Sequence, residues 1–182
     1  YLAKVRAHVR AVRASAAVEP RLSRLARAQH FALMTLFIVL AYTGFCHKYP
    51  DAVWSWPFHV MREGHFWRGM IHRVAAWAFT GLFLAHVVGL IASRRGRYAA
   101  RVLCPSLHDF ADFGRRIWAG LRGRQVELPH RRFNYVEKAE YWALIWGSAV
   151  MILTGAALIF SEAVLRHLPG VWIDVAQVIH LY

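Results

Sequence analysis

The sequence contains few cysteines and lacks several common catalytic motifs. Its two cysteines, Cys46 and Cys104, lie far apart. They exclude a disulfide framework, and the absence of a C-x-x-C-H motif excludes a covalently attached c-type haem. The sequence also lacks Walker A, G-x-G-x-x-G, H-E-x-x-H and nucleophile-elbow patterns. It therefore indicates no P-loop, Rossmann, zincin or α/β-hydrolase site.

Acidic residues are also scarce. Only 10 Asp and Glu residues stand against 23 Lys and Arg, giving a formal net charge of +13, whereas 58% of the 182 residues are hydrophobic. Disordered basic tails lack apolar residues, so that class is excluded. A soluble nucleic-acid-binding protein would account for the charge but not for the long apolar runs. A membrane protein accounts for both if charged and apolar segments are separate.

The apolar residues do gather in separate segments. Residues 28–46 contain no formal charge, and residues 69–92 and about 139–160 are similarly apolar. Each is long enough to cross a hydrocarbon core of about 30 Å at about 1.5 Å per residue. A fourth apolar segment begins near Val171 and is cut short at Tyr182. We therefore predict an all-α fold, a transmembrane four-helix bundle whose fourth helix is truncated in this sequence.

The arginines indicate the orientation of this bundle. Most of them lie in an N-terminal arm, residues 1–27, and in the connection formed by residues 93–136. Cytoplasmic loops carry an excess of Lys and Arg, so both segments are predicted to be cytoplasmic. Residues 47–68 are rich in Trp, Pro and His and predict an interfacial loop on the opposite side. We expect a bacterial inner-membrane protein with a cytoplasmic N-terminus, in contact with lipid and not with nucleic acid.

Four of the eleven histidines lie in the predicted spans: His30, His72, His86 and His180. Histidine inside a membrane span is costly and usually marks function. Residues 72 and 86 are about 21 Å apart along one helix and about 40° apart around it. That helix therefore presents two imidazoles on one face, one near each membrane surface. By topology, His180 lies near the level of His72, and His30 near that of His86.

Two levels of paired histidines favour two b-type haems. Each haem iron takes one neutral imidazole on either side of the porphyrin plane. Arg73, near a span end, is a candidate partner for a haem propionate, although a topogenic role explains it equally well. Two alternatives remain: the histidines hydrogen-bond to neighbouring helices, or they bind a transition metal. The second has a poor ligand set, because only Asp174 and Cys46 are available besides histidine.

Small residues offer weaker support for the haem interpretation. The pairs Thr43-Gly44, Thr80-Gly81 and Thr154-Gly155 place a glycine in each complete span. Glycine lets a neighbouring helix, or a flat macrocycle, approach the backbone closely. Ordinary helix packing explains these pairs as well.

Three runs carry a resemblance to a known family: RLARAQHFALMTLFIVLAYTGF, IHRVAAWAFTGLFLAHVVGL and RRFNYVEKAEYWALIWGSAVMILTGAAL. They resemble the first three spans of the prokaryotic cytochrome b561-like family. This family includes the membrane cytochrome b subunits of formate dehydrogenase, nickel-iron hydrogenase and thiosulfate reductase. Residues 21–182 are most similar to members that accompany periplasmic multihaem c-type cytochromes.

The resemblance implies four core spans, two b haems and exchange of electrons with quinone or quinol. It matches His30, His72 and His180 to family ligands, and His86 to an extra histidine of the multihaem-associated members. A further family ligand falls about four helical turns beyond His180, outside this sequence. The resemblance thus implies a haem held by His72 and His180 near the periplasm. It also implies a cytoplasmic-side haem held by His30, His86 or an outside residue.

The predicted function is that of an electron-transfer subunit in an oxidoreductase complex. It passes electrons between the quinone pool and a periplasmic c-type cytochrome or oxidoreductase subunit. At the head of the third span, residues 137, 138, 140 and 141 (Glu, Lys, Glu and Tyr) are candidates for moving quinone protons, or simply a charged helix start. The alternative function is a haem-free membrane anchor or assembly subunit.

Overall fold

The computed structural model describes residues 24–124 and 133–181. The predicted basic arm, apart from residues 24–27, lies outside the described residues. The chain forms two units, Tyr1–Thr35 and Leu36–Tyr182, and the boundary between them falls within a helix. Each unit is therefore described by itself.

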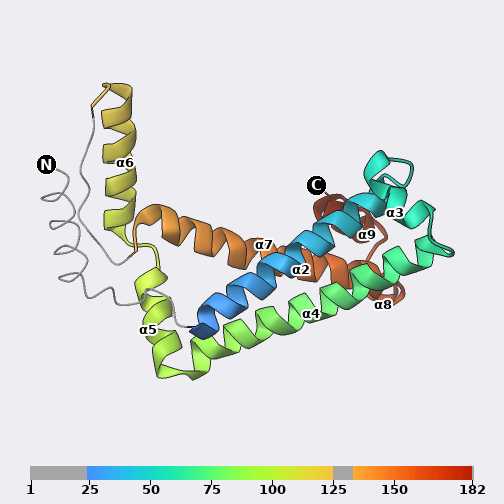
Figure 1. The fold of residues 1–182 in the computed structure, drawn as a ribbon. Helices are drawn as coiled ribbons and strands as arrows, with labels where there is room; N and C mark the ends of the chain where they lie inside the picture. The colour runs from blue at the N-terminus through green and yellow to red at the C-terminus, as the bar shows by residue number, and fades with distance from the viewer. Residues whose placement is uncertain (1–23, 125–132, 182) are drawn as a thin grey trace, which may run out of the picture. The chain divides into compact units, whose positions relative to one another are not determined.

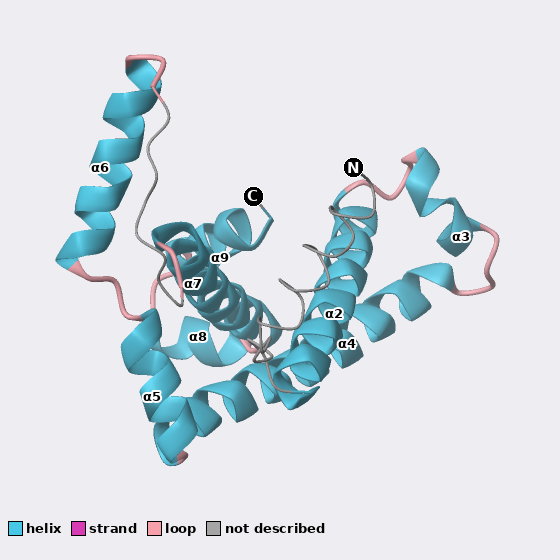
Figure 2. Cartoon of the chain, turned by 60° about the vertical axis from the view of Figure 1, so that its left-hand side comes forward, coloured by secondary structure: helices cyan, strands magenta, loops and turns pink. Residues whose placement is uncertain are grey.

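The described residues form helices and loops and contain no β-strand (Figure 2). This confirms the predicted all-α fold. In chain order (Figure 1), the elements are α2 (Arg24–Lys48), η1 (Val53–Ser55), α3 (Trp56–His59), α4 (Gly64–Ala92), α5 (Arg94–Leu103), α6 (Leu107–Leu121), α7 (Tyr135–Ile159), α8 (Ser161–His167) and α9 (Val171–Leu181).

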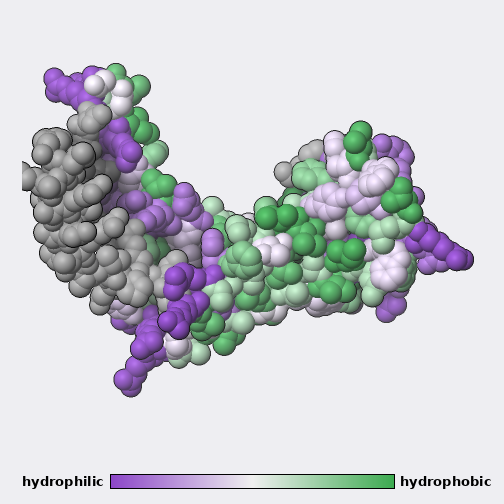
Figure 3. Space-filling view, viewed as in Figure 1, coloured by the Kyte–Doolittle hydropathy of each residue, from purple (hydrophilic) through white to green (hydrophobic). Residues whose placement is uncertain are grey.

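Three helices, α2, α4 and α7, are long and apolar enough to cross a membrane. Only 11%, 11% and 6% of their respective apolar segments are buried within the protein. Large apolar side chains such as Val88 and Leu153 are exposed, and Figure 3 shows hydrophobic residues over the stretch where α4 and α7 lie. Soluble proteins rarely expose apolar side chains along the whole length of several helices. The chain is therefore a multi-pass membrane protein. The shorter α9 is also apolar.

The start of α4 differs from the prediction. The helix begins at Gly64, so the end of the segment predicted as an interfacial loop, residues 47–68, is helical. The cause is local. Glu63 adopts a left-handed backbone conformation, with φ of 58°, and a Cβ on Gly64 would lie 1.6 Å from the Phe58 carbonyl oxygen. Glycine thus permits the close approach of α3 to the first turn of α4.

The predicted connection, residues 93–136, also contains helices. Ser93 caps α5 by accepting a hydrogen bond from the Gly96 amide at 2.8 Å. Ser106 and Asp109 form a capping box at the start of α6. These side chains satisfy backbone amides that have no partner within a helix. The connection therefore has its own folded elements between α4 and α7.

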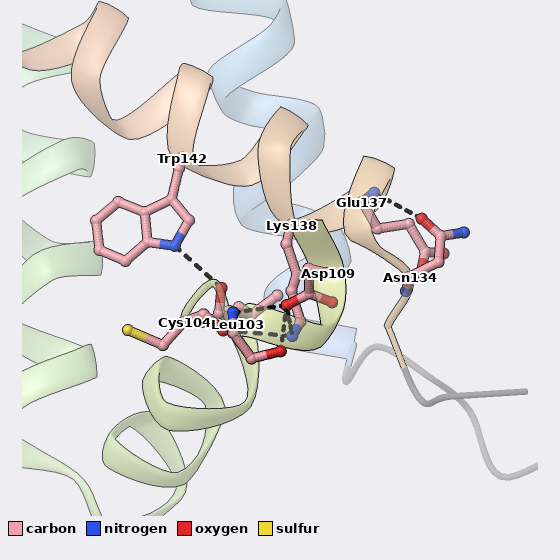
Figure 4. A network of polar contacts seen from close by, with 8 residues as sticks. Leu103, Cys104, Asp109, Asn134, Glu137, Lys138 and Trp142 are labelled. Atoms are coloured by element: carbon pink, nitrogen blue, oxygen red, sulfur yellow. Dashed lines mark hydrogen bonds and ion pairs between the residues drawn. The ribbon is translucent and has the colours of Figure 1, made fainter. Parts of the chain in front are cut away.

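A polar network attaches this connection to α7 (Figure 4). The Lys138 ammonium donates to the Asp109 carboxylate at 2.8 Å and to the Cys104 carbonyl at 3.3 Å. The Trp142 indole donates to the Leu103 carbonyl at 3.0 Å. Burial raises the pKa of Asp109, but hydrogen bonds from Lys138 and Ser106 outweigh it and lower that pKa to about 2. The ion pair therefore holds the first turn of α6 against the first turn of α7.

Candidate functional site

The structure brings two of the predicted histidines together. The His72 ring, on α4, and the His180 ring, on α9, have centroids 6.3 Å apart and planes at 80°. Both side chains are partly buried. Two imidazoles from helices far apart in the sequence thus meet within the second unit.

A threonine hydroxyl fixes the tautomer of His72. Thr43 Oγ1 lies 2.8 Å from His72 Nδ1 and 2.7 Å from the Val39 carbonyl oxygen. A threonine hydroxyl has one proton, and we assign it to the Val39 carbonyl, because a carbonyl oxygen only accepts. His72 Nδ1 must then be the donor to Thr43. The Nε2 atom of His72 consequently carries a lone pair and is the nitrogen able to ligate a metal.

The same arrangement recurs at His180. Thr154 Oγ1 lies 3.0 Å from His180 Nδ1 and donates to the Val150 carbonyl at 2.8 Å. His180 therefore also carries its proton on Nδ1 and a lone pair on Nε2. The threonine of the third Thr-Gly pair, Thr80, donates to the Ala76 carbonyl of its own helix at 2.8 Å.

The glycines that follow these threonines make room for the imidazoles. A Cβ on Gly155 would lie 2.9 Å from His180 Cε1, closer than such contacts normally come. A Cβ on Gly44 would lie 3.6 Å from His72 Cε1, an ordinary contact distance. At Gly81 a Cβ would meet no described atom within 4 Å. The Thr-Gly pairs on α2 and α7 thus each receive one histidine, with the tighter fit at Gly155.

A pocket of about 430 Å³ opens beside His72. The ring of His47, at the end of α2, lies 5.8 Å from that of His72. Arg73 has an exposed guanidinium whose Nε donates to the Gly69 carbonyl at 3.3 Å. A cation beside an imidazole cluster is suited to bind a carboxylate. The full lining is His47, His65, Phe66, Gly69, His72 and Arg73.

His86 has a different environment from that of His72. Its Nε2 lies 3.1 Å from the Tyr141 hydroxyl of α7, and both side chains are partly buried. The imidazole of His86 thus contacts the phenol group of Tyr141, not another imidazole. His30 lies in the first unit, exposed on α2. The pairing of His30 with His86 stays a prediction.

Two of the four candidates for moving protons at the head of α7 make contacts that support the alternative, a charged helix start. Glu137 accepts a hydrogen bond from the Asn134 amide at 2.8 Å, and its own amide donates to Asn134 Oδ1 at 2.9 Å. Lys138 is buried and paired with Asp109. Glu140 is exposed, and Tyr141 contacts His86. Tyr141 is therefore the member of this group that adjoins a predicted site residue.

The threonine partners of His72 and His180 and the role of Asp109 are not predicted from the sequence. The prediction from the Thr-Gly pairs uses only the small size of glycine. Thr43 lies on the long helix before the one that carries His72, and Thr154 on the long helix before the one that carries His180. That order was a usable signal. Asp109 offered a weaker one, because it is one of few acids in an arginine-rich segment.

The donor set of this site fits a haem better than a bare metal ion. In residues 24–124 and 133–181, no three His, Cys, Asp or Glu side chains form a group able to hold a metal ion. A haem iron needs only two protein ligands, because the porphyrin supplies the others. Two imidazoles bound to one metal at about 2 Å have ring centres about 6 Å apart. The 6.3 Å between the ring centroids of His72 and His180 is close to the value for two imidazoles on opposite sides of one metal.

Comparisons with known proteins identify no relative that would indicate what this site binds. The chain matches no known protein family and no curated protein. The resemblance to cytochrome b561-like proteins therefore stays an expectation, and the site itself supports the functional conclusion.

Proposed function

We propose that this chain is a b-type dihaem cytochrome subunit of the bacterial inner membrane, with a cytoplasmic N-terminus. It passes electrons between the quinone pool and a periplasmic c-type cytochrome or oxidoreductase subunit. The observation that carries this proposal is the His72–His180 pair, in which both imidazoles are held through Nδ1 by threonines and keep Nε2 for a metal.

Each residue of the pair would hold one face of a haem through Nε2. Thr43 and Thr154 keep the imidazoles in the ligating tautomer, a task that outer-shell partners commonly perform in metal sites. Gly155 leaves space for the His180 ring. Arg73, beside the His72 pocket, is placed to bind a propionate. When bound, haem supplies a one-electron redox couple whose potential depends on these ligands and their burial.

The second haem of the proposal belongs to the opposite end of α4. His86 lies 14 residues beyond His72 on this helix, which corresponds to about 21 Å. We assign His86, with His30 or a residue outside this sequence, to that haem. The Tyr141 hydroxyl contacts Nε2 of His86, so this imidazole would ligate through Nδ1 or exchange that contact for the iron. The same hydroxyl is also our candidate for passing protons to a quinone on that side.

A reduced-minus-oxidised spectrum of the detergent-purified protein tests the proposal. We expect b-type absorbance in the wild type. His72→Ala and His180→Ala should each remove the same haem and leave the other largely in place. The matched control is His167→Ala, because His167 is exposed on α8. Absence of b-type absorbance in the wild type would favour the haem-free anchor, and an unchanged spectrum in His72→Ala would refute the ligand assignment.

A further inference from the structure

Helix α6 turns an apolar face outward. Its exposed large side chains recur at helical spacing and share one side of the helix. Leu107 and Phe110 in the first turn are 85% and 67% exposed, and Leu121 at the end is 76% exposed. The exposed large apolar residues of α6 are Leu107, Phe110, Phe113, Ile117, Trp118 and Leu121.

The buried residues of α6 lie on the other side of the helix. They are Asp109, Asp112 and Ala119. Asp109 is paired with Lys138 of α7, and Asp112 binds Arg115 at 2.6 Å. This arrangement is the reverse of that in a surface helix of a soluble protein, where the apolar side faces the core. The apolar face of α6 therefore has little apolar cover among the described residues.

The charge around this face is strongly positive. In residues 94–124 the only acids are Asp109 and Asp112, and each is paired with a cation. The Arg122 guanidinium lies 4.2 Å from the centre of the Trp118 ring. Eight arginines in this segment are exposed: Arg94, Arg95, Arg97, Arg101, Arg115, Arg116, Arg122 and Arg124. The surface thus combines an apolar face with many cations, which is complementary to anionic lipid.

The attachment of α5 and α6 decides which partner covers this surface. Helix α5 starts at Arg94, two residues after α4 ends at Ala92, and Asp109 of α6 contacts Lys138 in the first turn of α7. Since α4 and α7 span the membrane, their end and start place both helices at one membrane surface. We propose that α6 lies in the headgroup region with its apolar face among the acyl chains, and that the arginines bind the phosphates of anionic lipids.

Site-directed spin labelling of the full chain in vesicles tests this placement. Nitroxides are attached at Phe110→Cys or Ile117→Cys in a Cys104→Ser background, since Cys46 is fully buried and remains unlabelled. The matched control is Arg116→Cys, on the polar side of the same helix. We expect labels at 110 and 117 to collide more with oxygen than with an aqueous nickel chelate, and the label at 116 to show the opposite ratio. Equal access to the chelate at all three positions would overturn the proposal.

The lipid composition separates headgroup binding from simple insertion. In vesicles of phosphatidylcholine with added phosphatidylglycerol, we expect the labels at 110 and 117 to lie deeper than in phosphatidylcholine alone. Replacing Arg94, Arg95 and Arg101 with Gln should abolish that difference. Equal depth in both lipids for the native arginines would contradict anionic-lipid binding. Labels shielded from both reagents, in lipid and in detergent, would show that a protein covers the face instead, which also overturns the proposal.

Discussion

The imidazole of His72 lies beside that of His180, with ring centroids 6.3 Å apart, and the Nδ1 atom of each lies within hydrogen-bond distance of a threonine hydroxyl. The two rings are therefore alike in tautomer, environment and available nitrogen. Ordinary helix packing would require one hydrogen bond per histidine and no match between the two. The match is the observation on which the proposed bis-histidine haem site rests.

The threonines should control haem retention without being ligands. Thr43→Val and Thr154→Val keep the side-chain volume but remove the oxygen that accepts from Nδ1. We expect haem affinity, measured by transfer of haem to an apoprotein acceptor, to fall about 10–100-fold in each variant. Serine at either position should restore it. Thr80→Val is the matched control, because Thr80 contacts its own helix; an equal loss there would refute the assigned role.

Gly155, which contacts the His180 ring, should not tolerate a side chain. In Gly155→Ala the new methyl group would lie 2.9 Å from His180 Cε1, so the ring must move and its bond to Thr154 lengthens. We expect loss or spectral shift of the haem assigned to His72 and His180. Gly147→Ala on the same helix meets no described atom within 4 Å and should leave the spectrum unchanged. A normal spectrum in Gly155→Ala would argue against the geometry of His180.

The Asp109–Lys138 pair should make the attachment of α6 to α7 dependent on pH. The pKa of Asp109 in the folded protein, about 2, is below its ordinary value of 3.8. The attached state therefore binds fewer protons than the detached state, and its stability rises with pH. The contribution is fully present above about pH 4 and is lost as the pH falls toward about 2. Hydrogen exchange of the α6 amides, corrected for intrinsic rates, should show weaker protection at the lower pH.

Substitutions at this pair should remove that dependence. Asp109→Asn leaves a buried ammonium without a charged partner, which we expect to cost about 3–5 kcal/mol. Arg115→Ala is the control, because the Arg115 side chain is 58% exposed and its pair with Asp112 should contribute less than about 1 kcal/mol. Equal protection of α6 in Asp109→Asn and in the wild type would contradict a stabilising role for the pair.

The orientation of the chain can be tested with its own cysteines. Cys104 is exposed in the arginine-rich connection, whereas Cys46 is buried. A thiol reagent that cannot cross membranes should label Cys104 in inverted membrane vesicles and not in right-side-out vesicles, because the connection is predicted to be cytoplasmic. Cys104→Ser should abolish the labelling. Labelling in right-side-out vesicles alone would reverse the proposed topology.

The sequence predicted the helical spans because membranes impose a simple requirement on length and polarity. The spans of α2, α4 and α7 follow from uninterrupted apolar runs, and the predicted proximity of His72 and His180 follows from topology. The start of α4 could not be predicted in this way. It depends on the contact of Gly64 with the Phe58 carbonyl and on the left-handed conformation of Glu63, which no hydropathy pattern encodes.

The hydrogen-bonding roles were harder to predict than the spans. Lys138 is one of four residues predicted either to move quinone protons or to form a charged helix start, and the structure buries it against Asp109, 29 residues earlier in the chain. Thr43 and Thr154 contact histidines on other helices, so their role depends on helix rotation. Composition and periodicity determine which face is apolar. They leave open which polar atoms meet across helices.

The haem stoichiometry of the intact complex tests the central claim most directly. The pyridine haemochrome assay on purified protein should give two b-type haems per chain for the wild type. It should give one for His72→Ala and one for His86→Ala, since each substitution removes a ligand of a different haem. A wild-type protein without bound haem, or substitutions that leave two haems in place, would contradict the account.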